Sequence, residues 1–334
     1  MNKKIVNLSM IALYLILASL IGCNSKPKQS ALKVGVIIGP ALAKQVDIVK
    51  SAAQAVCNDT GRGVVFIKTV KSEQAGEFQQ TANSLFKQEE SSTSIVGLVI
   101  GANCSVDLKP MIRSAVITGH PVILFNCDEP ESKRDAYVGI DNILAGKMLG
   151  KAVADSAGTS TRVIVLITGD ETILMYRQRA SAIRSQINLS ANLNIIKTIV
   201  NKNKNMEESA SKLAEFLSRT PNVYAIVSTG NWIFMPAYEK ALANYNGKLF
   251  AISNTPEAIE AVKSGRVAAL VVGDLYSQVY DATHLCLMRL QNQIIASPKP
   301  LKPFLVTQDN IKNFIRKWGK VRLVEKEAQK AEQK

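Results

Sequence analysis

Short apolar runs alternate with longer amphipathic segments through most of the chain. The runs are rich in Val, Ile and Leu, which is typical of strands buried on both faces of a parallel sheet. The segments between them repeat apolar residues with the period of an α-helix. Strands are predicted at 32–39, 63–70, 95–101, 121–126, 162–168, 194–200, 223–229, 248–253 and 267–273, and helices at 43–61, 75–88, 107–119, 145–158, 176–188, 206–219, 235–245 and 256–265.

The alternation is interrupted at the polar stretch 126–140 and then restarts. The pattern predicts an α/β fold of two doubly wound parallel-sheet lobes, because crossovers between parallel strands are right-handed. Ligands of such sheets bind beyond the carboxyl ends of the strands. The loops that should form a site are 39–44, 101–105, 126–130, 169–177, 230–236, 253–256 and 273–276.

The first residues predict an export signal. Lys3 and Lys4 precede an apolar stretch at 10–21, which is shorter than the ~20 residues needed to span a bilayer. The stretch ends in Leu-Ile-Gly-Cys, which resembles the lipobox of bacterial lipoproteins. That resemblance implies cleavage before Cys23 and a lipid on its sulfur. The expected location is the cell envelope, at the outer face of the cytoplasmic membrane or in the periplasm. A plain signal peptide with an incidental cysteine is the alternative.

The formal net charge of +14 falls to about +12 when Lys3 and Lys4 are removed with the signal. Many of the remaining cations lie in 310–334 and are mixed with Glu, which is typical of a solvated basic helix with a tail. Attraction to anionic lipid or acidic ligands is the alternative interpretation. No nucleic-acid-binding motif accompanies the charge, so no nucleic-acid partner is expected.

The five Cys and two His indicate no catalytic or metal site. No CxxC pair occurs, and neither His120 nor His284 has a visible nucleophile partner. The motifs GxGxxG, Walker A, HExxH and GxSxG are missing from the sequence. We therefore expect no enzymatic activity, no cofactor and no metal. Cys104 and Cys127 each follow a predicted strand, where either a disulfide or two free thiols would fit.

Four segments together point to a family. They are Gly-His-Pro-Val at 119–122, Val-Gly-Ile-Asp-Asn-Ile-Leu-Ala-Gly at 138–146, and the stretches 254–272 and 306–318. In this order they resemble type I periplasmic solute-binding proteins, the ribose-binding-protein-like group that serves sugar ABC transporters. The resemblance covers roughly residues 32–320, and several ordered matches are more specific than one motif.

The resemblance implies two lobes joined by a three-strand hinge, with a cleft that closes on a small solute. The closed protein, expected to be a monomer, would present its solute to a membrane permease and perform no chemistry. The implied divisions are a signal peptide at 1–22, a lipid-anchored tether at 23–31, a first lobe at 32–138 plus 275–302, a second lobe at 139–274 plus 303–320, and a basic tail at 321–334.

The residues that hold sugars in this family are mostly replaced here. The first-lobe Asp falls on Asn126 and the following Arg on Cys127, whereas the Arg at the start of a second-lobe helix matches Arg177. Other family positions fall on Gly230, Asn231, Ser253 and Gly273, and the first loop has no aromatic residue. The predicted ligand-binding residues are Asn126, Cys127, Asp128, Arg177, Asn231, Trp232, Ser253, Asn254, Asp274 and Tyr276.

A pyranose site needs carboxylates and amides for the hydroxyls and an aromatic face for the ring. Asp128 is expected to be the acid nearest the ligand, with Lys133 and Arg134 in a solvated hinge loop outside the cleft. Arg177 would bind a hydroxyl pair, a carboxylate or a phosphate, or else form a surface salt bridge. Trp232 directly follows a strand and is expected in the cleft, with a core position as the alternative.

We therefore expect a membrane-anchored solute-binding lipoprotein of an ABC importer, with a sugar or sugar-like ligand and an ABC permease as partner. A nucleoside or a flat-ring vitamin is the alternative ligand, because Trp232 and Tyr276 would offer stacking faces. A sensor that docks a membrane receptor is the alternative role.

Overall fold

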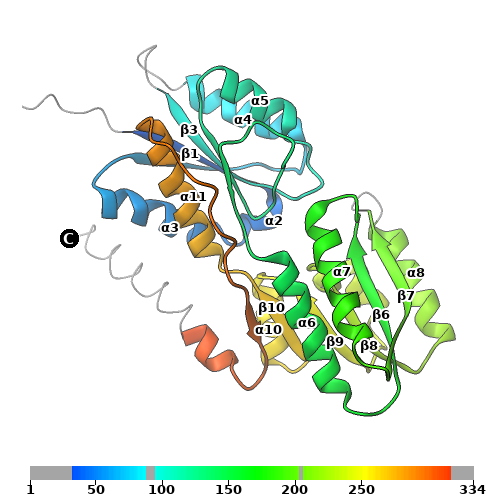
Figure 1. The fold of residues 1–334 in the computed structure, drawn as a ribbon. Coiled ribbons are helices and arrows are strands. Elements are labelled where there is room, and N and C mark those ends of the chain that lie inside the picture. The colour runs from blue at the N-terminus through cyan, green and yellow to red at the C-terminus, as the bar shows by residue number, and fades with distance from the viewer. Residues whose placement is uncertain (1–31, 88–94, 203–205, 317–334) are drawn as a thin grey trace, which may run out of the picture. The chain divides into compact units, whose positions relative to one another are not determined.

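The structure is a computed structural model that describes residues 32–87, 95–202 and 206–316. The predicted signal peptide, Cys23 with its tether, and the basic tail lie outside the described residues. The described residues belong to one compact unit that begins at Leu32 (Figure 1). No helix in the described ranges is both long and apolar enough to cross a membrane.

The first lobe is built on a parallel five-stranded sheet in the order β2-β1-β3-β4-β5. Its core lies on both faces, because α3 and α11 cover one side and α4 and α5 the other. The strands are β1 (Lys33–Ile38), β2 (Val64–Thr69), β3 (Val96–Gly101), β4 (Val122–Phe125) and β5 (Ala136–Val138). The helices are α2 (Pro40–Ala43), α3 (Val46–Thr60), α4 (Ala75–Lys87), α5 (Lys109–Ile117) and α11 (Leu275–Leu290).

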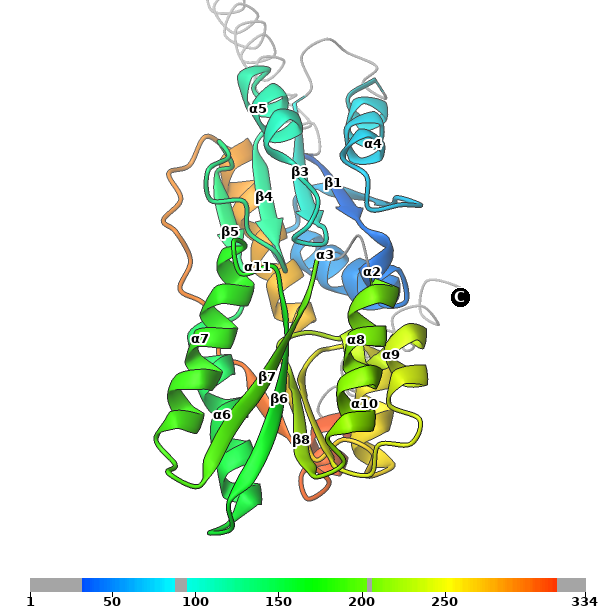
Figure 2. The ribbon, with the colours of Figure 1, turned by 90° about the vertical axis from the view of Figure 1, so that its right-hand side faces the viewer.

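The second lobe is built on a six-stranded sheet in the order β11-β10-β9-β8-β6-β7, parallel except for β11. Figure 2 shows α6 and α7 on one side of it and α8, α9 and α10 on the other. The strands are β6 (Arg162–Gly169), β7 (Leu193–Asn201), β8 (Val223–Ser228), β9 (Lys248–Ile252), β10 (Ala269–Val272) and β11 (Phe304–Val306). The helices are α6 (Asn142–Ala157), α7 (Leu174–Asn188), α8 (Met206–Arg219), the 3-10 turn η1 (Trp232–Phe234), α9 (Pro236–Ala241) and α10 (Pro256–Lys263).

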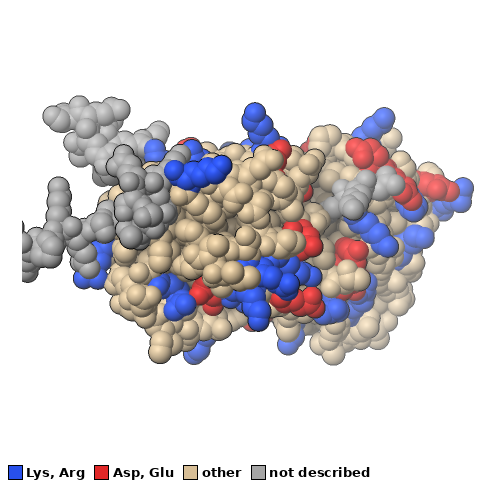
Figure 3. All heavy atoms as spheres, turned by 90° about the horizontal axis from the view of Figure 1, so that it is seen from above, with Lys and Arg blue, Asp and Glu red and all other residues tan. Residues whose placement is uncertain are grey.

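The predicted fold class is confirmed, since the two sheets are predominantly parallel and carry helices on both faces. The short strands β5 and β11 were not predicted, because three residues are too few to give a hydrophobic pattern. The predicted helix at 43–61 corresponds to α3, which begins three residues later, and the short α2 lies in the predicted loop 39–44. On the face shown in Figure 3, Lys and Arg side chains are interspersed with Asp and Glu.

Three connections link the lobes, and they lie against one another. The first follows β5, the second joins β10 to α11, and the third runs from α11 to β11. The first and third connections pair as a parallel bridge between Ile140 and Leu301, with Asp141 N donating to Leu301 O at 2.9 Å. The second passes so close to the first that a Cβ on Gly273 would lie 2.8 Å from Cγ2 of Ile140. These connections form a narrow hinge.

Two of the connections end in aspartate helix caps. Asp141 accepts a hydrogen bond from Leu144 N at 2.8 Å at the start of α6. Asp274 accepts one from Ser277 N at 3.1 Å at the start of α11. An aspartate at this position satisfies an amide that has no partner within the helix. Both helices therefore begin directly at the hinge.

Candidate ligand-binding cleft

A cavity of about 110 Å³ lies where the two lobes meet the hinge. The first lobe contributes the loops after β1, β3 and β4, and the second lobe contributes the loops after β6, β8 and β9. The hinge contributes Ile140, Gly273 and Gln278. The site therefore lies beyond the carboxyl ends of the strands of both sheets, as parallel α/β sheets dictate.

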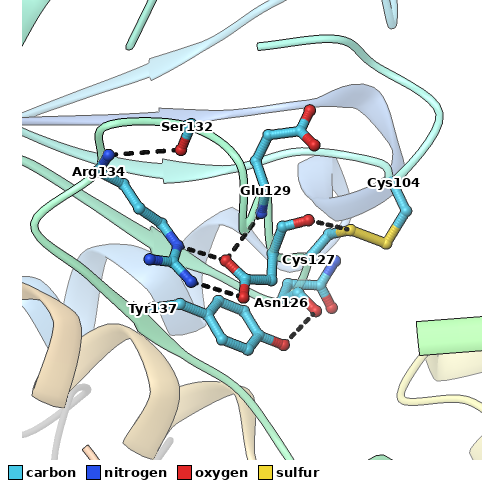
Figure 4. Close-up of polar contacts among 8 residues, drawn as sticks. Cys104, Asn126, Cys127, Glu129, Ser132, Arg134 and Tyr137 are labelled. Carbon is cyan, nitrogen blue, oxygen red and sulfur yellow. Dashed lines mark hydrogen bonds and ion pairs between the residues drawn. A yellow bond between two sulfur atoms is a disulfide. The ribbon is translucent and has the colours of Figure 1, made fainter. Parts of the chain in front are cut away.

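The structure places Asn126, Asn231, Ser253 and Asn254 on the cavity wall. Asn126 follows β4 with a φ of +65°, a left-handed conformation that asparagine adopts more readily than most residues. Burial raises the pKa of Tyr137 to about 12, so its phenol is neutral and donates to Asn126 O at 3.2 Å (Figure 4). This bond holds the turn that presents the Asn126 side chain.

Asp128 is not the cleft acid that the sequence predicted. Its carboxylate binds the Arg134 guanidinium through two oxygens, with Arg134 Nη2 donating to Asp128 Oδ2 at 2.7 Å. The hydrogen bond to Asp128 raises the pKa of Arg134. Arg134 lies off the cavity wall, as expected, but its side chain is only 21% exposed and is therefore less solvated than expected. The pair satisfies the carboxylate within its own loop, away from the cavity.

Cys104 and Cys127 are joined by a disulfide, with Cα atoms 5.3 Å apart (Figure 4). The sequence left this pairing open. The bond links the loops after β3 and β4, which are neighbouring strands. Cys104 lies on the cavity wall, whereas Cys127 is buried behind it. Cys127 therefore supports the wall and does not line it, contrary to its predicted role.

Trp232 takes the core position that the sequence offered as the alternative. It is 3% exposed within the second-lobe core, because η1 turns the chain inward directly after β8. Its ring lies 5.2 Å from that of Tyr176, centroid to centroid. The aromatic residue on the cavity wall is Tyr176.

Asp274 and Tyr276 also lie outside the cavity wall. The Asp274 carboxylate caps α11 and accepts a second hydrogen bond from Ser277 Oγ at 2.8 Å. Tyr276 packs against the first-lobe core, with its ring 6.3 Å from that of Tyr280. The residue of α11 that does reach the cavity is Gln278, whose Nε2 donates to Asp274 O at 3.2 Å. Tertiary packing places Gln278 there, and no local sequence pattern indicated it.

The arginine on the cavity wall is Arg179 and not the predicted Arg177. Two residues advance an α-helix by about 200°, so Arg177 points away from the cavity and is exposed. Arg179 Nε donates to Asn142 Oδ1 at 2.8 Å and Nη1 donates to Thr229 O at 3.0 Å. Burial lowers the pKa of Arg179. The sequence did contain evidence for Arg179. It lies three residues after Tyr176, and this spacing places both residues on the same face of α7.

The wall is rich in amides and poor in charge. Asn103, Asn126, Asn231, Asn254 and Gln278 contribute side-chain amides. Arg179 is the charged residue among the described residues that line the cavity. Each amide offers both donors and an acceptor, which suits a ligand that itself has both. Within the described ranges, no group of His, Cys, Asp and Glu is arranged to hold a metal ion.

Two contacts join the lobes at the rim of the cavity. Gln45, which precedes α3, donates from Nε2 to Asn254 O at 2.7 Å. The neighbouring Lys44 forms an ion pair with Glu257 of α10. Deeper in, Cys104 Sγ lies 3.8 Å from Met175 Sδ. The lobes are therefore in contact around the cavity, which is the arrangement of a closed cleft.

Comparison with known proteins gives a consistent result. A family model described as a periplasmic binding protein domain matches residues 34–294. No curated protein matches the sequence.

Solved structures similar to the chain include AraP, an arabinose-binding protein from Geobacillus stearothermophilus. It has a TM-score of 0.69 and 18% identity over 85% of this chain and 99% of that one. The periplasmic ribose ABC transporter from Conexibacter woesei has a TM-score of 0.70 and 19% identity, covering 86% and 95%. GanP, a glucose-galactose binding protein from Geobacillus stearothermophilus, has a TM-score of 0.68 and 18% identity, covering 84% and 99%.

Proposed function

The chain belongs to the type I periplasmic binding protein family, and from this membership and its cleft we propose that it captures a small sugar-like solute for an ABC importer. Proteins of this family bind solutes and are not enzymes. The solute is held between two lobes that close about the hinge, and the closed protein docks on a membrane permease.

The observation that carries this proposal is the amide-rich cavity between the lobes. A hydroxyl both donates and accepts a hydrogen bond, and a side-chain amide can answer both roles. Asn126 comes from the first lobe, and Asn231 and Asn254 come from the second, so a bound solute would bridge them. The similar structures named above bind arabinose or glucose and galactose, or belong to a ribose transporter, which supports a sugar-like solute.

A nucleoside or flat-ring vitamin is less well supported. That alternative depended on Trp232 and Tyr276 as stacking faces, and neither lines the cavity. Tyr176 is the aromatic residue that remains on the wall, and it is itself packed against Trp232. A single buried ring can stack against only one face of a flat-ring ligand.

We extend the proposal to the anchor. The Leu-Ile-Gly-Cys sequence supports a lipid on Cys23, which would hold the protein at the outer face of the cytoplasmic membrane or in the periplasm. Radiolabelled palmitate fed to a bacterial host should enter the full chain and should not enter the Cys23→Ser variant. Equal labelling of both chains would exclude this anchor.

Mass spectrometry of the small molecules released by denaturing purified residues 24–334 tests the ligand class. A pentose, a hexose or a close derivative is the expected result. Asn231→Ala should then weaken binding of that compound by about 2- to 10-fold, the effect of losing one neutral hydrogen bond. The control is Asn244→Ala, an exposed amide outside the cavity. Release of an aromatic heterocycle, or equal effects of both variants, would overturn the proposal.

A further inference from the structure

The cavity holds a buried cation without a neutralising partner. Arg179 is 9% exposed, and the two acceptors of its hydrogen bonds, Asn142 Oδ1 and Thr229 O, are uncharged. No described carboxylate forms an ion pair with it. Its remaining nitrogen, Nη2, forms no hydrogen bond with a described residue. Nη2 is also not one of the fully buried side-chain atoms that lack a partner, so it is accessible from the cavity. The guanidinium therefore faces the cavity and still has N–H groups that can donate to a ligand.

Four acidic residues near the cavity-lining segments have partners of their own outside the cavity. Asp128 is paired with Arg134, and Asp141 and Asp274 cap α6 and α11. Glu73 lies behind the first-lobe loops, where its carboxylate accepts hydrogen bonds from Ala41 N at 3.2 Å and Asn103 N at 3.3 Å. None of these carboxylates is on the cavity wall.

An unpaired charge out of water is costly, so a buried arginine is normally matched by an anion. A neutral sugar would displace water from Arg179, and its uncharged hydroxyls would be the only groups to accept hydrogen bonds from the guanidinium. A carboxylate or phosphate would accept charge-assisted, bidentate ones, because the planar guanidinium matches both groups. The difference between these outcomes favours an anionic ligand.

We propose that the solute carries an oxyanion group that binds Arg179, with its hydroxylated remainder against the amides of the two lobes. The inference rests on the proposed function and narrows it, from sugar-like solutes in general to acidic ones. A sugar acid and a sugar phosphate share the required chemistry. Arg179 is the charged side chain among the described residues on the cavity wall, and no described acidic residue lines it.

Matched pairs of probes separate the charge from the rest of the molecule. Titration calorimetry on residues 24–334 would compare D-galacturonate with D-galactose, D-gluconate with D-glucitol, and D-ribose 5-phosphate with D-ribose. We expect an acidic member to bind at least about 30-fold more tightly than its neutral partner, the lower end for losing one side of a buried charged pair. The first two pairs test a carboxylate, and the third tests a phosphate.

Two results would overturn the inference: a neutral member that binds as tightly as its acidic partner, or no binding by any acidic probe. In either case a neutral sugar released from the purified protein would leave the proposed function standing. Failure of the proposed function has a different signature, the release of a compound unrelated to sugars.

Variants assign the preference to Arg179. Arg179→Met should abolish the preference for the acid while changing the affinity for the neutral partner far less, and Arg179→Lys should retain part of it. The matched control is Arg177→Met, which removes an exposed arginine from the same helix and should leave the preference unchanged. If Arg179→Met fails to fold, the methyl ester of galacturonate answers the question on the unaltered protein. The ester should lose the 30-fold advantage, and an ester that binds as tightly as the acid would exclude an ionic role.

Discussion

A disulfide joins Cys104 to Cys127. Cys104 lines the cavity, and so does Asn126, which directly precedes Cys127. The disulfide closes a loop between residues 23 apart in sequence. It thereby couples the loops after β3 and β4, which are also joined by sheet pairing and by a hydrogen bond from Asn126 Nδ2 to Ala102 O at 3.4 Å. The first-lobe wall of the cleft is therefore a cross-linked surface.

Reduction of this disulfide should lower the free energy of unfolding by about 2–4 kcal/mol, because the cross-link restricts the unfolded chain. It should also weaken ligand binding, since the Asn126 turn loses one of its constraints. Urea unfolding of residues 24–334 with and without dithiothreitol measures the first effect, and calorimetry with the released solute measures the second. The Cys104→Ser/Cys127→Ser variant is the control, because the reductant should not change it further. A parent protein that is indifferent to reductant would contradict this expectation.

Asp128→Asn should affect stability and leave ligand specificity unchanged. Its partner Arg134 is 21% exposed, so the variant leaves a half-buried guanidinium without its carboxylate. We expect a loss of about 1–3 kcal/mol in the free energy of unfolding, the cost of one unsatisfied charged group. Chemical denaturation and calorimetry with matched ligands separate the two effects. A change in ligand preference with unaltered stability would instead indicate that Asp128 contacts the ligand, as the sequence predicted.

The sequence was informative where a single rule governs position. Buried strands end at one edge of a parallel sheet, and this rule alone brings Asn126, Asn231, Ser253 and Asn254 to the cavity. It could not decide the direction of a side chain within a loop. Trp232 follows a strand as these residues do, but η1 turns it into the core.

Other differences required knowledge of long-range partners or a closer use of periodicity. The role of Asp128 depends on Arg134, six residues away, and an ion pair between them has no sequence pattern of its own. Gln278 reaches the cavity only because α11 begins at the hinge. Arg179 is different, since the helical period of α7 already placed it on the same face as Tyr176. As ligand contacts, all these residues remain predictions.

The rim contacts should contribute to closure in a pH- and salt-dependent way. The Lys44 ammonium lowers the pKa of Glu257 through a hydrogen bond in the closed cleft. Its contribution to closure is therefore present above the ordinary pKa of a glutamate and is lost as the pH falls through the lowered value. Because both side chains are largely exposed, we expect Lys44→Met to weaken binding only about 2-fold, and less in high salt. Calorimetry at two salt concentrations measures this, with Lys50→Met as an exposed control.

Gln45→Ala should have a larger effect than Lys44→Met. Gln45 is 4% exposed, and its hydrogen bond to Asn254 O spans the lobes. We expect a roughly 2- to 10-fold loss of affinity, the effect of one neutral hydrogen bond, and an increase in the dissociation rate. Stopped-flow displacement of the released solute measures that rate. An affinity equal to that of the parent would show that the contact does not stabilise the closed form.

Gly273→Ala should disturb ligand binding through the hinge. A Cβ at this position would lie 2.8 Å from Cγ2 of Ile140 and 3.3 Å from Nε2 of Gln278, and both of these residues line the cavity. The methyl group therefore has to displace part of the wall, and overpacking of this kind costs about 1–3 kcal/mol. We expect a clear loss of affinity, measured by calorimetry. The matched control is Gly76→Ala in α4, where a Cβ meets nothing within 4 Å and the helix should gain stability. If both variants bind the solute equally well, the hinge tolerates a side chain here and the close approach to Ile140 does not position the wall.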